Sequence, residues 1–395
     1  MKYVVLILDG AAGLPIPAKK NRTCLEISST PNLDQLARHG QLGMAATVPQ
    51  GMEPSSAVAC MSVIGYDPRE YYKGRAAIEA TSLDIAISED EVVFRCNLVN
   101  TEGGIMQSYC AGHISTDEAN ELIKALNEAI GSRRISFYPG VGYRHILKLK
   151  AYNETLQAIT TPPHDISNLP ISDYLPRGEG SKLLLKLIED SKLVLKNHPI
   201  NTRRLAENQI TADSIWLTWG SGKPPKLPSF KQAYGKTAAI TSGVDLLRGL
   251  GKMVSMDILD IPGVTDGQDN NCIAQTEGAI EALNYHDLVV IHYEAPDEAG
   301  HAGSIEQKVA AIEQADREMI GRLANFLENR GRLLIMPDHP TPIELLTHTS
   351  DPVPYLMWGK GIAVGEGCRF TENEARRSGI VCDPGWQLMQ RFTKG

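Results

Sequence analysis

Aspartate and histidine residues recur directly after apolar runs in this sequence. If the runs are parallel strands, their carboxyl ends meet at one edge of a sheet, and these side chains lie together there. Three carboxylates and three imidazoles so close would repel and desolvate one another unless a cation lay among them. Mixed aspartate and histidine ligands suit Mn²⁺ or Zn²⁺, and the set is large enough for two ions. The residues are Asp9, Asp297, His301, Asp338, His339 and His348. A single aspartate after a strand is usually only a turn or cap residue, so the metal hypothesis depends on their joint occurrence.

A possible nucleophile lies in "GMEPSSAVACMSVIGYDP", where Ser55 and Ser56 precede a run of small residues typical of a helix start. A serine there lies beside exposed N–H groups and the positive end of the helix dipole, which can hold a phosphoryl oxygen. Two metal ions about 4 Å apart are common in displacement at phosphorus and would activate such a hydroxyl. The structural alternative is a serine that only caps the helix. Together these residues predict metal-dependent phosphoryl transfer.

The composition bounds the class of protein. The chain has 395 residues, a formal net charge of -8 and a pI near 5.7, which argues against nucleic acid as the main partner. No apolar run is long enough for a membrane helix, and "MKYVVLILDG" is too short and too quickly polar for a signal peptide. We therefore expect a cytoplasmic protein. The seven scattered cysteines form no C-x-x-C pair, which argues against disulfides and against a zinc ribbon.

Apolar runs alternate along the chain with amphipathic segments, and this alternation predicts an α/β fold with a mostly parallel sheet flanked by helices. We expect strands at 2–10 and 288–293, each entering the ligand-rich edge, and one long helix from 305 to a stop at Gly331. The middle of the chain is rich in proline and turn residues. We expect a smaller inserted α/β domain at 111–180, leaving a core of 1–110 and 181–395.

Five segments together resemble a known family. The segments "LILDG", "PSSAVACMSVIGYDP", "EAPDEAGH", "MPDHPTP" and "THTSDPVP" are similar to those of archaeal-type 2,3-bisphosphoglycerate-independent phosphoglycerate mutases, of the alkaline phosphatase superfamily. The resemblance runs from Lys2 to about Gln390. It implies an alkaline-phosphatase-like core, an inserted domain that covers the substrate, and a serine, Ser56, that becomes phosphoserine.

The resemblance also implies the ligands and the cofactors. One ion would be held by Asp9, Ser56, Asp338 and His339, and the other by Asp297, His301 and His348. The cofactors would be two divalent metal ions, Mn²⁺ or Zn²⁺, with Mg²⁺ as a further option.

The implied reaction interconverts 3-phosphoglycerate and 2-phosphoglycerate, so the expected partner is a small phosphorylated hydroxy acid, with neither nucleic acid nor membrane. The sequence makes no prediction of the oligomeric state. Binding such an acid requires cations, although each candidate taken alone is more often a solvated surface charge. The candidates are Arg144, Arg203, Arg204 and Lys236. His113 in "CAGHIST" is a candidate acid/base or phosphate contact.

The sequence departs from the mutase pattern after the nucleophile. Ala57 and Cys60 stand where an acidic residue and a histidine are expected, and "TTPPHDI" also differs from the family. These features resemble a subgroup proposed to act as homoserine kinase in threonine biosynthesis, and that function is the alternative. The chain has no P-loop motif, so any use of ATP would be of another type. A phosphatase is a third alternative, whereas a sulfatase would need an arginine that "SSAVAC" lacks.

Overall fold

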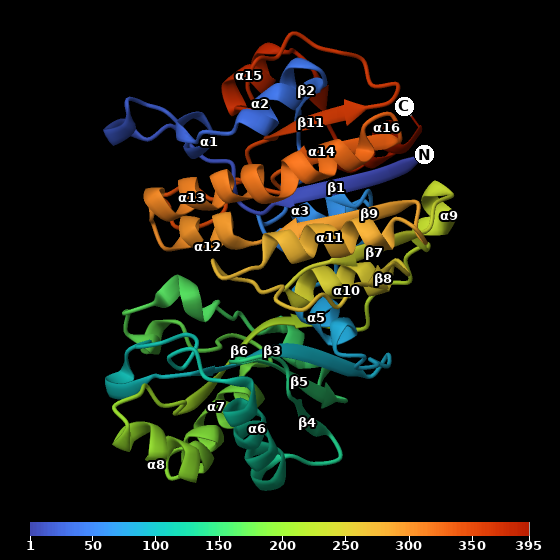
Figure 1. Ribbon diagram of the computed structural model, residues 1–395. Coiled ribbons are helices and arrows are strands. Elements are labelled where there is room, and N and C mark those ends of the chain that lie inside the picture. The colour runs from blue at the N-terminus through green and yellow to red at the C-terminus, as the bar shows by residue number, and fades with distance from the viewer. Residues whose placement is uncertain (395) are drawn as a thin grey trace. The chain divides into compact units, whose positions relative to one another are not determined.

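The computed structural model describes residues 1–394, which form two compact units (Figure 1). The first unit combines Met1–Tyr72 with the chain from Lys226 onward, and the second is Lys73–Pro225. The second unit is longer at both ends than the expected insertion at 111–180. The reason is its sheet, in which β3 (Glu91–Val99) pairs with β6 (Ser214–Ser221), so residues on both sides of that segment belong to one core.

The first unit contains an eight-stranded sheet, in which most neighbouring strands run parallel, as predicted. β1 lies between β9 and β10 and is parallel to both, and β7 is parallel to β9. Only β11 runs antiparallel to its neighbours, β10 and β2. The strands in sheet order are β12 (Val381–Cys382), β2 (Gln41–Ala45), β11 (Val353–Gly359), β10 (Gly331–Met336), β1 (Lys2–Leu8), β9 (Leu288–Tyr293), β7 (Ala238–Thr241) and β8 (Asp257–Ile258).

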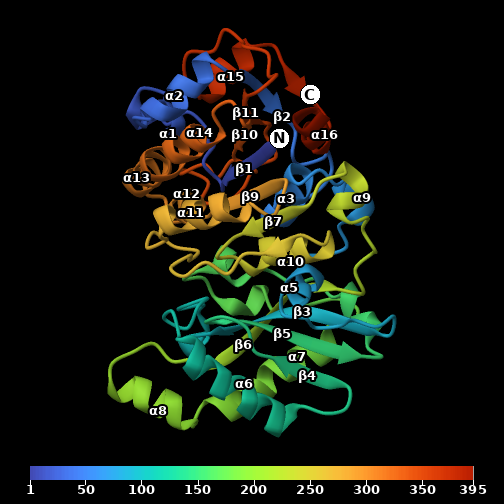
Figure 2. The same cartoon turned by 45° about the vertical axis from the view of Figure 1, so that its right-hand side comes forward.

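The central strands are apolar throughout because helices cover both faces of the sheet. Val4 and Leu6 of β1 belong to a core that also contains residues of α11, α13 and α14. On the opposite face, Tyr3 packs edge-on against Phe392 of α16, with ring centroids 5.6 Å apart. Figure 2 shows β1 and α16 side by side. Because helices cover both faces of the sheet, polar side chains gather at the ends of the strands.

The helices of the first unit include one interruption that the sequence did not predict. The expected helix from 305 to Gly331 consists of α13 and α14 joined by a π-helical turn, Asp316–Ile320, and Gly331 begins β10. The helices are α1 (Cys24–Ile27), α2 (Pro31–Arg38), α3 (Ser56–Val63), α4 (Pro68–Tyr71), α9 (Phe230–Tyr234), α10 (Asp245–Met253), α11 (Cys272–Ala282), α12 (Ala295–His301), α13 (Ile305–Ala315), α14 (Gly321–Leu327), α15 (Glu372–Arg377) and α16 (Leu388–Lys394).

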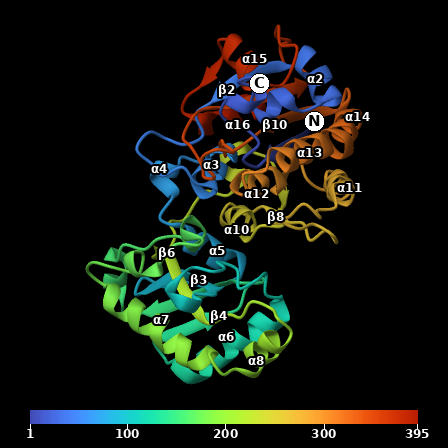
Figure 3. The ribbon, with the colours of Figure 1, turned by 90° about the vertical axis from the view of Figure 1, so that its left-hand side faces the viewer.

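The second unit contains a four-stranded antiparallel sheet in the order β4-β5-β3-β6. The helices α6 and α7 cover one face with a core of leucine and isoleucine (Figure 3). The helix α5 packs against the other face. The remaining elements of this unit are β4 (Ile135–Tyr138), β5 (Arg144–Lys150), α5 (Arg75–Ser82), α6 (Thr116–Ile130), α7 (Ser181–Leu195) and α8 (Pro199–Ala206).

Within residues 1–394, no helix combines the length and the apolar character that crossing a membrane requires.

Candidate metal centre and nucleophile

The predicted ligands come together at the carboxyl edge of the large sheet. Asp9 follows β1, whereas Asp338 and His339 follow the neighbouring parallel strand β10. The segment after β9 forms the helix α12, which carries Asp297 and His301. A spacing of four residues places both side chains on one face of that helix, and His301 Nε2 lies 3.1 Å from Asp297 Oδ2.

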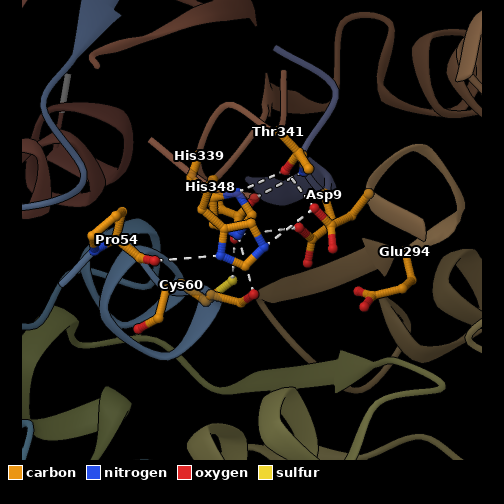
Figure 4. Close-up of polar contacts among 12 residues, drawn as sticks. Asp9, Pro54, Cys60, Glu294, His339, Thr341 and His348 are labelled. Atoms are coloured by element: carbon orange, nitrogen blue, oxygen red, sulfur yellow. Dashed lines mark hydrogen bonds and ion pairs between the residues drawn. The ribbon is translucent and has the colours of Figure 1, made fainter. Parts of the chain in front are cut away.

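A first group surrounds His339 (Figure 4). His339 Nε2 lies 3.2 Å from Asp338 Oδ2, 3.5 Å from Asp9 Oδ1 and 3.1 Å from Ser56 Oγ. Asp9, Asp338 and His339 are completely buried, and Ser56 is nearly so. The four residues that the resemblance assigned to one ion are therefore neighbours in space.

A second group consists of Asp297, His301 and His348. The Nε2 atoms of the two histidines face each other at 2.9 Å, and Asp297 Oδ1 lies 3.5 Å from His348 Nε2. The Nδ1 atoms point to backbone carbonyls, that of Leu346 for His301 at 2.9 Å and that of Pro54 for His348 at 3.3 Å. Carbonyls only accept, so each Nδ1 carries a hydrogen, and each ring directs its Nε2 toward the other ring and Asp297. Two Nε2 atoms beside a carboxylate form an arrangement that a cation can bind in place of protons.

Thr341 connects the two groups. Its hydroxyl donates to Asp297 Oδ1 and lies 3.3 Å from His339 Nδ1. Because the hydroxyl hydrogen is used on the carboxylate, the oxygen can accept the Nδ1 hydrogen of His339. This leaves the Nε2 lone pair of His339 directed at the first group, in the orientation that metal-bound histidines adopt.

The charges of the cluster fit a divalent ion. Asp9 Oδ1 is buried and has no hydrogen-bond partner among residues 1–394. Burial, and then the nearby carboxylates of Asp338 and Asp297, raise the pKa of Asp9 well above its usual range. A cation bound there would relieve both the repulsion and the unpaired oxygen.

His301 and His339 differ in their protonation. Burial raises the pKa of Asp297, but His301 and His348 outweigh it and hold that pKa well below the usual range. Burial lowers the pKa of His301, yet Asp297 outweighs it and raises that pKa to about 9. Burial lowers the pKa of His339 to about 4. His339 is therefore neutral at pH 7 and able to bind a metal.

The structure separates the roles of the two adjacent serines. Ser55 is the N-cap of α3, and its hydroxyl accepts the N–H of Val58 at 3.4 Å. Ser56 is the first residue of the helix, and its hydroxyl points to His339 instead. The capping alternative therefore applies to Ser55, and Ser56 is in the position that a metal-activated nucleophile requires.

The glycine of "LILDG" is Gly10, and its surroundings exclude any other residue. Its φ is +57°, and a Cβ at this position would lie 2.3 Å from Asp297 Oδ1 and 2.5 Å from Thr341 Oγ1. Its N–H donates to Asp338 Oδ1 at 3.2 Å. Only glycine allows the backbone to approach these side chains so closely.

Cys60 belongs to the cluster as well. Its thiol donates to Asp338 Oδ2 at 3.2 Å, and its sulfur lies close to ligand atoms of Asp9 and His292. Burial, and then Asp338, raise the pKa of Cys60 well above its usual value. The residue that departs from the mutase pattern thus remains a protonated hydrogen-bond donor to a predicted ligand.

Three of the predicted substrate residues lie in the second unit around a cavity of about 650 Å³. Arg203 and Arg204 both form ion pairs with Glu118, at 2.6 and 2.7 Å. Arg204 is buried and also donates to the carbonyls of Ala111 and Ile210, which are structural contacts. His113 is exposed at the rim of the cavity.

The other two predicted cations lie elsewhere. Arg144 begins β5 in the second unit, with its guanidinium 5.3 Å from the ring centroid of Tyr143. Lys236 lies 4.8 Å from the ring centroid of Tyr3, at the start of β1. Asp9 follows the other end of that strand, so Lys236 occupies the edge of the sheet opposite the ligands and is not part of the candidate site.

Four polar residues of the site were not singled out from the sequence. His292 and Glu294 lie inside the segment "LVVIHYEAPDEAGH", where an imidazole within a buried strand was an available signal. Lys308 is completely buried and donates to the carbonyls of Ala12 and Thr341, at 3.1 and 2.7 Å, which ties together the loops after β1 and β10. Thr341 in "HPTP" and Lys308 in a helical run carry no signal that separates them from ordinary surface residues.

Comparisons with known proteins agree over the whole chain. A family model described as 2,3-bisphosphoglycerate-independent phosphoglycerate mutase matches residues 37–201. A protein of Methanothrix thermoacetophila with that name is 45% identical and covers 100% of both chains. A protein of Methanosarcina mazei with the same name is 46% identical, covering 91% of this chain and 90% of the relative.

Solved structures share the fold. A protein of Pyrococcus horikoshii superimposes with a TM-score of 0.81 at 27% identity, covering 100% of this chain and 96% of that one. A cofactor-independent phosphoglycerate mutase of Thermoplasma acidophilum superimposes with a TM-score of 0.62 at 23% identity, covering 100% of this chain and 99% of that one. The sequence comparison therefore identifies the family, and the solved structures agree with this chain in fold.

Proposed function

The chain belongs to the 2,3-bisphosphoglycerate-independent phosphoglycerate mutase family, and on this basis we propose that it interconverts 3-phosphoglycerate and 2-phosphoglycerate through Ser56. The observation that carries the proposal is the hydroxyl of Ser56, which lies 3.1 Å from His339 Nε2 and beside two groups of candidate ligands. A nucleophile next to paired metal sites is the arrangement that phosphoryl transfer requires.

The proposed ligands follow the two groups. Asp9, Ser56, Asp338 and His339 would hold one divalent ion, and Asp297, His301 and His348 the other. Mixed oxygen and nitrogen donors favour Mn²⁺ or Zn²⁺. When bound, such ions lower the pKa of a serine hydroxyl and neutralise charge on phosphoryl oxygens.

The chain's own residues perform the transfer in two steps. In the first, Ser56 Oγ forms a bond to the phosphorus while the bond from phosphorus to the substrate's oxygen breaks, and the proton of Ser56 ends on the released oxygen. In the second, the other hydroxyl of the glycerate forms a bond to the phosphorus while the bond to Ser56 Oγ breaks, and the proton of that hydroxyl ends on Ser56 Oγ. The N–H groups at the start of α3 lie beside Ser56 and can stabilise the phosphoryl oxygens throughout. We place this reaction in the cytoplasm, as expected from the sequence.

The homoserine kinase alternative is not favoured, because relatives at 45–46% identity over nearly the whole chain carry the mutase name. Cys60, one of the residues that raised the alternative, packs inside the ligand cluster and leaves Ser56 in place.

The test is ³¹P NMR of the purified, Mn²⁺-supplemented protein with 3-phosphoglycerate. Growth of a 2-phosphoglycerate signal supports the proposal. Steady release of inorganic phosphate without 2-phosphoglycerate would identify a phosphatase instead, and the absence of any conversion with either Mn²⁺ or Zn²⁺ would overturn the proposed activity.

A further inference from the structure

A fourth histidine, His292, lies beside the cluster but is not among the predicted ligands. It occupies β9, and its side chain is completely buried. Its Nε2 lies 2.6 Å from Asp9 Oδ2, and its Nδ1 lies 3.0 Å from the hydroxyl of Ser242, directly after β7. The ring therefore bridges a predicted metal ligand and a buried serine.

The contacts of Ser242 determine the tautomer of His292. Ser242 Oγ accepts the N–H of Val244 at 2.9 Å, and its own hydroxyl hydrogen remains available to donate. His292 Nδ1, at 3.0 Å, is the nearer acceptor, because the carbonyl of Val244 lies 3.5 Å away. With the hydroxyl hydrogen on Nδ1, the neutral ring carries its own hydrogen on Nε2 and donates it to Asp9.

This orientation is opposite to that of the three histidines assigned to the metals. His301 and His348 direct their Nδ1 hydrogens to backbone carbonyls, and His339 directs its own to Thr341. Those rings direct their Nε2 atoms into the cluster, where each can bind a metal ion. His292 presents an Nε2 hydrogen, so it is a donor to a ligand and not a ligand.

The hydrogen bond from His292 places the two carboxylate oxygens of Asp9 in different environments. Its Oδ2 accepts from His292, and its Oδ1 has no hydrogen-bond partner among the described residues and lies 3.5 Å from His339 Nε2. We propose that Ser242 and His292 are positioning residues, which hold Asp9 through Oδ2 so that Oδ1 is presented to the metal ion. This inference rests on the proposed metal-binding role of Asp9.

Glu294 and Cys60 raise a competing possibility, in which His292 is itself a metal ligand. Glu294 points toward the cluster from the end of β9 (Figure 4), and its Oε2 lies 3.3 Å from His292 Nε2, farther than Asp9 Oδ2. Asp9, Cys60 and His292 also lie close enough together to hold an ion themselves. In that case His292 would be a ligand, and its removal would change the number of bound ions and not only their affinity.

The experiment measures Mn²⁺ stoichiometry by elemental analysis and Mn²⁺ affinity by EPR titration, neither of which depends on turnover. His292→Leu removes the donor. His292→Gln places an amide N–H near the position of Nε2, and Ser242→Ala removes the hydroxyl that fixes the tautomer. Ser28→Ala is the matched control, since Ser28 is buried in the same unit and its hydroxyl donates to the Cys24 carbonyl at 2.8 Å.

We expect His292→Leu to weaken Mn²⁺ binding by roughly 10- to 100-fold with the stoichiometry unchanged, which is typical of lost outer-shell contacts. We expect His292→Gln to retain most of the affinity, Ser242→Ala to lose several-fold, and Ser242→Ala to have no further effect in the His292→Gln background. Wild-type affinity in His292→Leu, loss of one ion in any His292 variant, or an undiminished effect of Ser242→Ala beside His292→Gln would each overturn the proposal. Because metal binding is read directly, a protein without mutase activity would refute the proposed function and leave this test intact.

Discussion

Ser56 Oγ lies 3.1 Å from His339 Nε2, although 283 positions separate the two residues in the chain. The contact joins the start of α3 to the end of β10 and places a hydroxyl among buried metal-ligand atoms. The neighbouring serine, Ser55, has no such contact among residues 1–394 and caps the helix instead.

These two serines provide a matched pair of variants. We expect Ser56→Ala to lose at least 1,000-fold in mutase turnover, on the order of removing a nucleophile, with the thermal unfolding temperature nearly unchanged. We expect Ser55→Ala to retain most of the turnover and to lower the free energy of unfolding by about 1 kcal/mol, the usual effect of a lost N-cap. Steady-state kinetics and thermal denaturation measure both. Full activity in Ser56→Ala would show that another group is the nucleophile.

Without a bound metal ion, the clustered carboxylates of the candidate site repel one another. Burial, and then the nearby carboxylates of Asp338 and Asp297, raise the pKa of Asp9 in the metal-free protein, so the charge of Asp9 contributes no stability there. We expect the metal-free Asp9→Asn variant to be at least as stable as the metal-free wild type. Mn²⁺ at 100 times its Kd should stabilise the wild type by about 2.7 kcal/mol and the variant by much less.

Thermal denaturation with a chelator and with Mn²⁺ provides this comparison. Asp90→Asn is the control, because Asp90 lies in the second unit and is half exposed. Its response to Mn²⁺ should equal that of the wild type. If Asp9→Asn gained as much stability from Mn²⁺ as the wild type, Asp9 would not be a ligand.

The reactivity of the cysteine thiols tests whether the candidate site is buried. All seven cysteines are free, and Cys368 is exposed, whereas Cys60 and the other five are buried. Burial and Asp338 also keep Cys60 protonated, and a buried thiol reacts slowly. We expect a disulfide reagent to label one cysteine rapidly in the native protein and seven in denaturant, with the rapid reaction abolished in Cys368→Ala. Rapid native labelling of Cys60 would contradict the buried cluster.

The clustering of the candidate ligands could be predicted from the sequence, because the strand-then-aspartate pattern fixes an edge of the sheet once the strands are parallel. Asp9, Asp297 and Asp338 follow β1, β9 and β10, which are neighbours. The same logic should have excluded Lys236, which precedes β7 and so lies at the other edge. The structural role of Arg204 could not be predicted in this way, because its ion pair with Glu118 joins residues 86 positions apart. The bounds of the second unit also depend on a distant pairing, that of β3 with β6.

Glu79 gives the fold of the second unit a dependence on pH. It is buried, and it accepts from Arg95 at 2.5 Å and from Arg75 at 2.8 Å. Burial raises the pKa of Glu79, but Arg95 and Arg75 outweigh it and lower that pKa from its ordinary value of 4.5 to about 2. A carboxyl whose folded pKa is depressed contributes stability above its unfolded pKa and loses that contribution as the pH falls through its folded pKa. The contribution of Glu79 is therefore complete at pH 5 and above and disappears toward pH 2.

Glu79→Gln tests this dependence, because a glutamine resembles the protonated acid. We expect the variant to be less stable than the wild type by about 3 kcal/mol at pH 7, and the difference to shrink between pH 4.5 and 2. Urea unfolding at each pH measures the difference. Glu89→Gln is the control, since Glu89 pairs with Lys223 at 2.8 Å but is 85% exposed, and it should change stability by less than about 1 kcal/mol at any pH. A difference for Glu79→Gln that stayed constant down to pH 2 would mean that the lost stability comes from packing and not from the charge of this carboxylate.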